Sequence, residues 1–148
     1  MKTSILSALF AGSAAMLFFC LHAPAPAQAD PAGVTKCLDE MIAGAAAQGR
    51  RLRATDADST PAKEAVDYRL TLYKGMTYVL LGCADEGVDL DLRLYDSEGN
   101  LVDKDGAEDN KPFVFVEPAA TGEYVMQVLV YKTDKPKNDF AVGITYQY

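Results

Sequence analysis

The sequence predicts a mainly β protein, an antiparallel β-sandwich preceded by one N-terminal α-helix. Two observations carry this prediction. After residue 65, apolar and polar residues alternate in roughly seven short segments that are spaced as strands are in β-sandwiches. Before residue 50, apolar residues recur at helical spacing in one stripe. The elements are justified below in chain order.

An export signal is expected at the N-terminus. Lys2 precedes an apolar run from Ile5 to Leu21, and Ala27-Gln28-Ala29 supplies the small residues that a signal peptidase requires. Residues 1–29 are therefore expected to be removed, so that the mature chain begins at Asp30. The mature protein is then periplasmic or secreted, and no membrane segment remains in it.

The mature chain is strongly acidic. Loss of Lys2 leaves 13 Lys and Arg against 21 Asp and Glu, a net charge of −8. A surface of this sign repels phosphates, so nucleic acid is not expected as a partner. A cation or a basic protein surface fits the charge better.

Residues 30–50 are expected to form the single helix. Asp30 resembles an N-cap before Pro31 at the first helical position, and Gly49 marks the end. The apolar stripe comprises Val34, Cys37, Leu38, Met41, Ile42 and Ala45. A stripe at this spacing is typical of a helix face that packs on a protein core.

Cys37 and Cys83 are expected to form a disulfide. Cys20 leaves with the signal peptide, so an even pair of cysteines remains in an oxidising compartment. The mature chain has no histidine, because His22 is also removed, and it has no Cys-x-x-Cys spacing, so a redox or metal role is disfavoured. The bridge would close a loop of about 45 residues and contribute roughly 4 kcal/mol in the chain-entropy model. It would fasten the helix to the sheet domain.

Residues 51–65 are expected to form a loop that connects the helix to the sandwich. The segment is polar and shows no periodicity, and it contains Asp56, Asp58, Ser59, Thr60 and Pro61.

Residues 66–148 follow the alternation that is typical of strands. In the clearest segment, Val88, Leu90, Leu92 and Leu94 alternate with polar residues, which places the apolar set on one buried face. A type I turn follows, with Asp96 at its first position and Gly99 at its fourth. Further strands are expected at 66–72, 76–83, 101–102, 113–116, 124–130 and 140–146.

Three short motifs stand out among these strands: Asp89-Leu90-Asp91-Leu92, Tyr95-Asp96 with Gly99-Asn100, and Thr121-Gly122-Glu123-Tyr124. In this order, the region from about residue 66 to 148 resembles the bacterial pre-peptidase C-terminal domain. The resemblance implies a jelly-roll β-sandwich of the kind that is attached to secreted peptidases and also occurs alone in exported proteins. This chain carries no peptidase and adds a helix at its front. Some members of the family bind calcium through Asp-rich segments, and others bind extracellular polymers such as collagen.

An enzyme is not expected. The mature chain has no histidine for Ser-His-Asp or Cys-His mechanisms, and Ser59 and Ser97 are its only serines. The remaining catalytic alternative is a secreted, glycosidase-like hydrolase that uses Asp89 and Asp91, which lie two residues apart on one strand face. A general acid needs an apolar pocket that raises its pKa, and this segment is crowded with other acids.

A small outer-membrane β-barrel is a further alternative, because residues 143–148 end the chain with a glycine and spaced aromatics. Such a barrel needs at least eight strands of about ten residues. The expected strands are fewer and shorter, so the sandwich is preferred.

Calcium is the expected cofactor if the protein has one. Ca²⁺ prefers six to eight hard oxygen ligands. The candidate ligands are five aspartates that the β-hairpin would bring together, Asp89, Asp91, Asp103, Asp105 and Asp109. Glu108 and Asn110 add further oxygens in the same segment around Gly106. The segment around Gly106 is not an EF-hand loop, since it lacks the third acidic ligand and the closing Glu.

Tyrosines supply a candidate binding surface. Tyr73, Tyr95 and Tyr131 fall on the outward phase of their strands and would form a platform for a protein or an extracellular polymer if they share one surface. The sequence as a whole therefore favours an exported, non-catalytic binding or accessory module.

Overall fold

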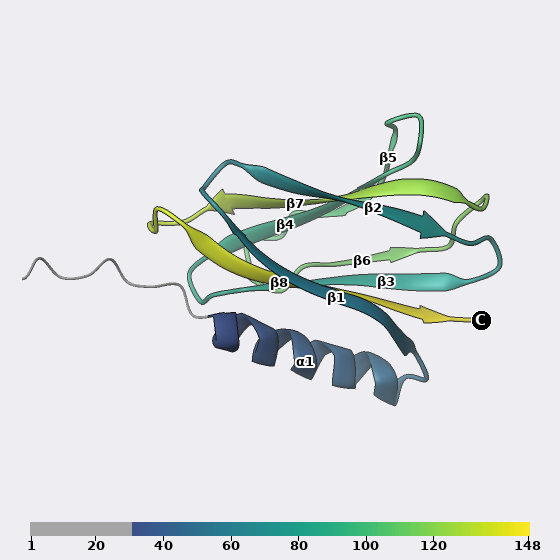
Figure 1. Cartoon of the computed structure of the whole chain (residues 1–148), viewed down its shortest axis with the longest axis horizontal. Coiled ribbons are helices and arrows are strands. Elements are labelled where there is room, and N and C mark those ends of the chain that lie inside the picture. The colour runs from purple at the N-terminus through teal and green to yellow at the C-terminus, as the bar shows by residue number, and fades with distance from the viewer. Residues whose placement is uncertain (1–30) are drawn as a thin grey trace, which may run out of the picture.

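The structure, a computed structural model, describes residues 31–148, and the expected signal peptide lies outside these residues. One helix precedes eight strands, and the chain folds into two facing sheets with the helix against one of them (Figure 1). The elements are α1 (Pro31–Ala47), β1 (Arg51–Thr60), β2 (Ala65–Leu72), β3 (Thr77–Ala84), β4 (Asp89–Tyr95), β5 (Leu101–Asp105), β6 (Phe113–Val116), β7 (Gly122–Lys132) and β8 (Asn138–Gln147). The predicted antiparallel β-sandwich with one N-terminal helix is confirmed.

The strand order is that of a jelly roll. One sheet has the order β1-β8-β3-β6 and the other has the order β2-β7-β4-β5. The pairing is nested: β4 pairs with β5, β3 with β6, β2 with β7 and β1 with β8, all antiparallel. The chain is thus a long hairpin, with β4 and β5 at its tip, that is wrapped into two four-stranded sheets.

The core lies between the sheets and follows the predicted alternation. Leu90, Leu92 and Leu94 of β4 are fully buried, and they pack with inward residues from both sheets such as Tyr78, Met126 and Phe140. Burial of these side chains supplies most of the driving force for the sandwich.

The turn between β4 and β5 is built by Asp96, as predicted. Its backbone carbonyl accepts a hydrogen bond from the amide of Gly99, and its carboxylate accepts bonds from the amides of Glu98 and Asn100. The Asn100 side chain also donates to this carboxylate. These bonds, those from Asn100 first, lower the pKa of Asp96.

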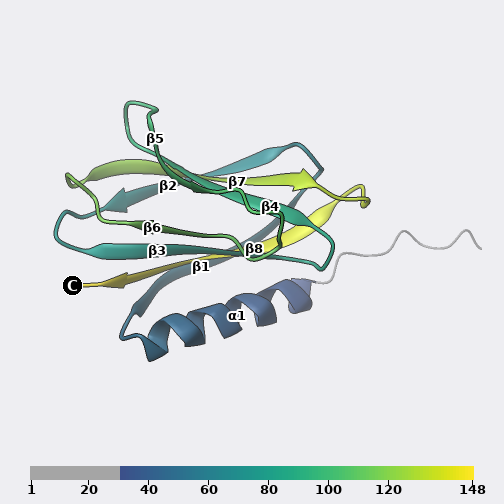
Figure 2. The same cartoon turned by 180° about the vertical axis from the view of Figure 1, so that it is seen from behind.

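Helix α1 lies along the outer face of the β1-β8-β3-β6 sheet (Figure 2). Val34 and Leu38 are buried against Leu81 and Ala141, as the apolar stripe predicts. The helix approaches closely at Gly143, where a β-carbon would lie 3.3 Å from a methyl group of Leu38. The predicted disulfide between Cys37 and Cys83 joins the helix to β3 and is confirmed.

The prediction that residues 51–65 form a loop is wrong for most of the segment, because residues 51–60 are strand β1. β1 is an edge strand that pairs only with β8, and nearly all of its residues are exposed, so it has no buried face to impose an alternating pattern. Asp56 and Asp58 lie opposite the inward residues Val142 and Phe140 in register. Inward charges on an edge strand protect it from pairing with another chain.

The two aspartates of β1 also affect Tyr68 of β2. The Tyr68 hydroxyl is buried beside the Asp56 carboxylate. Its desolvation first, and the neighbouring Asp56 and Asp58 carboxylates second, raise the pKa of Tyr68 well above its usual value.

Within residues 31–148, no helix combines the length and the apolar character that a membrane span requires.

Candidate functional site

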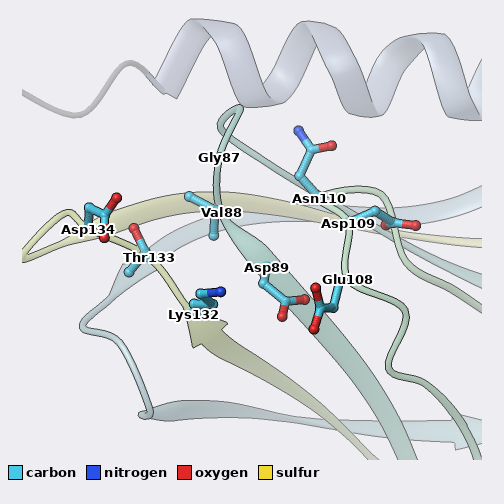
Figure 3. Close-up of a pocket in the computed structure, with 9 residues that line it drawn as sticks. All are labelled: Gly87, Val88, Asp89, Glu108, Asp109, Asn110, Lys132, Thr133 and Asp134. Carbon is cyan, nitrogen blue, oxygen red and sulfur yellow. The ribbon is translucent and has the colours of Figure 1, made fainter.

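A pocket of about 270 Å³, which we call the acidic pocket, lies at the end of the sandwich where β4 begins and β7 ends. Three segments line it: the start of β4, the segment that leads from β5 to β6, and the turn after β7 (Figure 3). Its lining residues are Gly87, Val88, Asp89, Glu108, Asp109, Asn110, Lys132, Thr133 and Asp134.

Asp89 is the central group of the acidic pocket. Its side chain and that of Glu108 point toward each other (Figure 3). Asp89 is only 9% exposed, and its Oδ1 atom is buried without a hydrogen-bond partner. Desolvation first, then repulsion from Asp91 and Glu108, raise the pKa of Asp89, and Lys132 opposes the shift. The pocket therefore holds a buried carboxylate, one oxygen of which has no hydrogen-bond partner.

The strand pairing explains why Asp89 is buried although it lies on the outward phase of β4. The segment before β6 crosses β4, since the Leu90 amide donates to the Asp109 carbonyl over 2.9 Å. The same segment extends the pairing with β3, where the amides of Gly82 and Ala84 donate to the carbonyls of Pro112 and Asn110. Residues 108–112 thus close the open side between the two sheets and cover the outward aspartate.

The predicted calcium ligands are only partly brought together. Asp89 and Asp109 line the acidic pocket, whereas Asp91, Asp103 and Asp105 do not. Asp91 lies against Gly106 and forms an ion pair with Arg93 at 3.3 Å.

The carboxylates of two predicted ligands, Asp105 and Asp109, accept hydrogen bonds from backbone amides. The Asp105 carboxylate accepts hydrogen bonds from the amides of Ala107 and Phe113, and that of Asp109 accepts one from Lys111. Across residues 31–148, no three acidic, cysteine or histidine side chains are gathered closely enough to hold a metal ion. Calcium binding remains a proposal, and its candidate ligands are the carboxylates that line the acidic pocket, those of Asp89, Glu108 and Asp109.

Asp89 and Asp91 do not face one shared pocket, because only Asp89 lines the acidic pocket. A hydrolase that used this pair of carboxylates would need both at the same sugar bond. The structure therefore offers no support for that alternative.

The three predicted surface tyrosines lie apart. Tyr95 and Tyr131 are at opposite ends of the β4–β7 pair. Tyr95 lies at the end of β4, opposite Val125, whereas Tyr131 is the unpaired residue of a bulge beside the start of β4. Tyr73 lines a third place, beside Arg53, Met76, Tyr78, Tyr146 and Tyr148. Sequence reasoning missed this cluster because its members come from three places far apart in the sequence: β1, the β2–β3 turn with the start of β3, and the C-terminal residues at the end of β8.

Replacement of Asp89 by Asn is expected to raise the melting temperature at pH 7 by about 2–4 °C, because it removes a buried carboxylate charge that Asp91 and Glu108 repel. The folded state raises the pKa of Asp89, so it holds the proton more tightly than the unfolded chain does. Wild-type stability is therefore lost as pH rises through the folded-state pKa. The advantage of the Asn variant should shrink as pH falls from neutral.

Thermal unfolding from pH 7 down to the ordinary carboxyl range tests this expectation. Asp39→Asn is the matched control, since Asp39 is exposed on α1 and should show no such pH dependence. An Asp89→Asn variant that melts below the wild type, or that keeps the same offset at every pH, would contradict it.

No protein-family model matches the chain, and no curated protein matches its sequence. Two solved structures share its fold. PliG of Aeromonas hydrophila, a periplasmic inhibitor of g-type lysozyme, aligns with a TM-score of 0.51 and 12% identity over 68% of this chain and 90% of its own. The pre-peptidase C-terminal domain of collagenase from Bacillus anthracis aligns with a TM-score of 0.51 and 16% identity over 63% of this chain and 89% of its own. The predicted resemblance to the pre-peptidase C-terminal domain is thereby confirmed at the level of the fold.

Proposed function

We propose that this protein is an exported, non-catalytic binding module whose acidic pocket receives a cationic group of a protein partner. The observation that carries the proposal is the buried Oδ1 atom of Asp89, which has no hydrogen-bond partner. A lysine or arginine of a partner that enters the pocket would pair with the Asp89 and Glu108 carboxylates and would relieve their repulsion.

Export is supported by the disulfide between Cys37 and Cys83, since such bonds persist mainly in oxidising compartments. A basic partner is supported by the net charge of the mature chain, −8 once Lys2 is lost from the 14 Lys and Arg that oppose 21 Asp and Glu. Complementary charge accelerates the encounter of two proteins and fixes their register. One protein with this fold is a periplasmic inhibitor of g-type lysozyme, which supports a protein as the partner.

The test measures binding of the mature protein to g-type lysozyme and to basic proteins captured from the native periplasm, at low and high salt. Wild-type binding should weaken with salt. The Asp89→Asn variant should bind about ten-fold more weakly, because a charged hydrogen bond at a buried site is lost. The Asp39→Asn control should bind as the wild type does. Partners that bind both variants equally well, or the absence of any basic partner, would contradict the proposal.

Calcium is a second candidate occupant of the acidic pocket. The Asp89 and Glu108 carboxylates point toward each other and repel, so a divalent cation between them would remove an unfavourable term (Figure 3). Asp109, which also lines the pocket, would supply a further oxygen ligand.

Calcium at millimolar concentration should raise the melting temperature of the wild type by a few degrees, since an ion that binds only the folded state stabilises it. Asp89→Asn should abolish this shift, and Asp39→Asn should keep it. Calorimetry that shows no heat of binding, together with identical melting in Ca²⁺ and in EDTA, would rule calcium out.

A further inference from the structure

We propose that a second pocket, formed around Arg53, binds an acidic sugar unit, that is, a pyranose ring that carries a carboxylate. We call it the tyrosine pocket. It is lined by Arg53, Tyr73, Met76, Tyr78, Tyr146 and Tyr148, none of which lines the acidic pocket. The inference does not depend on the proposed function of the acidic pocket.

The Arg53 side chain is fixed in place by three contacts. One guanidinium nitrogen donates a hydrogen bond to the Thr71 carbonyl over 2.7 Å. The guanidinium carbon lies 5.8 Å from the ring centre of Tyr73 and 6.0 Å from that of Tyr78, within the range of cation–π attraction. Arg53 is thus held on aromatic rings, with one of its donors engaged.

Arg53 forms no ion pair within residues 31–148. The tyrosine pocket contains no carboxylate side chain. A guanidinium has five N–H donors in a planar fork that matches a carboxylate. An anionic group at this place would gain two charge-assisted bonds without displacing an acidic side chain of the protein.

The tyrosine rings supply the rest of the site. Tyr78 is buried and forms the inner wall of the pocket. Its hydroxyl accepts a hydrogen bond from the Tyr73 amide and donates one to the Met76 sulfur. Tyr146 and Tyr148 meet edge to face with ring centres 5.7 Å apart, and Tyr148 is 78% exposed. The accessible rings of Tyr73 and Tyr148 thus present apolar faces beside hydroxyl groups.

These features together select the ligand class. The pocket measures about 200 Å³, below the usual range for drug-sized ligands, so it suits a single ring. A pyranose has an apolar C–H face that can stack on an aromatic ring, and its hydroxyl groups can form hydrogen bonds with tyrosine hydroxyls. A carboxylate on the sugar would form an ion pair with Arg53. An apolar amino-acid side chain would leave the hydroxyls without partners, which favours the sugar acid over a peptide carboxylate.

The test is a titration of the mature protein with methyl glucuronide, followed by NMR of the tyrosine ring signals. The neutral analogue methyl glucoside and the peptide mimic N-acetyl-alanine serve as comparison ligands. We expect saturable millimolar binding of the glucuronide, shifts of the Tyr73 and Tyr148 signals, and at least about ten-fold weaker binding of both comparison ligands.

The variants separate the roles of charge and ring. Arg53→Gln should weaken glucuronide binding about ten-fold, and so should Tyr148→Ala, whose exposed side chain can be removed without unfolding the protein. Arg69→Gln removes the same charge from an exposed arginine of β2 outside the tyrosine pocket and should bind as the wild type does. A tetragalacturonate that binds more tightly than the monosaccharide would identify a polymer as the source, and equal affinity would identify a free sugar acid.

Three results would overturn the inference. The first is glucuronide binding that Arg53→Gln leaves unchanged in a variant whose circular dichroism matches the wild type. The second is equal binding of the glucoside or of N-acetyl-alanine. The third is the absence of any glucuronide binding. None of these results bears on the acidic pocket, whose tests use Asp89 variants.

Discussion

The double variant Cys37→Ala, Cys83→Ala is expected to melt roughly 10–15 °C below the oxidised wild type. The bond joins residues separated by 46 positions in the sequence. Closing a loop of this length lowers the entropy of the unfolded chain and contributes on the order of 4 kcal/mol. The loss should appear first in α1, which the bond holds on β3, so amide hydrogen exchange of residues 31–47 should accelerate more than that of β4 or β7.

Reduction of the wild type provides the control for this prediction. Reduced wild type and the double variant should melt within a few degrees of each other, because both lack the cross-link and the alanines remove only the two sulfur atoms. If the oxidised wild type and the double variant melt together, the bond does not stabilise the fold. If exchange accelerates equally throughout, the helix is not held separately by the bond.

Phe140→Ala is expected to destabilise the protein by about 3–5 kcal/mol, measured as a lower urea midpoint with an unchanged slope. Phe140 is fully buried in β8 and lies opposite Ala84 of β3 and Asp58 of β1. Its removal leaves a cavity in the core between the two sheets.

Phe115→Ala is the matched control, because Phe115 is 48% exposed on edge strand β6, where its ring lies under the Arg50 guanidinium. Its loss should cost about 1 kcal/mol or less. Equal effects of the two substitutions would show that burial in the sandwich does not determine the cost.

The parts of the fold that were predictable are those where one strand face is buried. In β4, the alternation of Leu90, Leu92 and Leu94 with polar residues follows directly from a face that packs into the core. The turn at Asp96 and Gly99 was equally local, because the bonds that form it join residues at most four positions apart. The apolar stripe of α1 identified its buried side for the same reason.

Strand β1 and the two pockets depend instead on residues far apart in the sequence. β1 has no buried face of its own and is held by its partner β8, so neither periodicity nor composition distinguishes it from a loop. Asp89 looked like an ordinary outward residue of β4, and only the crossing of residues 108–112 over it makes it buried. Arg53 meets Tyr73 and Tyr148 only after both ends of the domain have come together.

The nested strand pairing also determines how the chain can fold. The β4–β5 hairpin closes the shortest loop, and the pairs β3–β6, β2–β7 and β1–β8 close successively longer ones around it. Loop closure becomes costlier with length, and folds dominated by such distant pairs fold in milliseconds to seconds, about the slow end for small domains. We therefore expect the hairpin to form first and the β1–β8 pair last. This order would leave the tyrosine pocket unassembled until β8 has paired with β1.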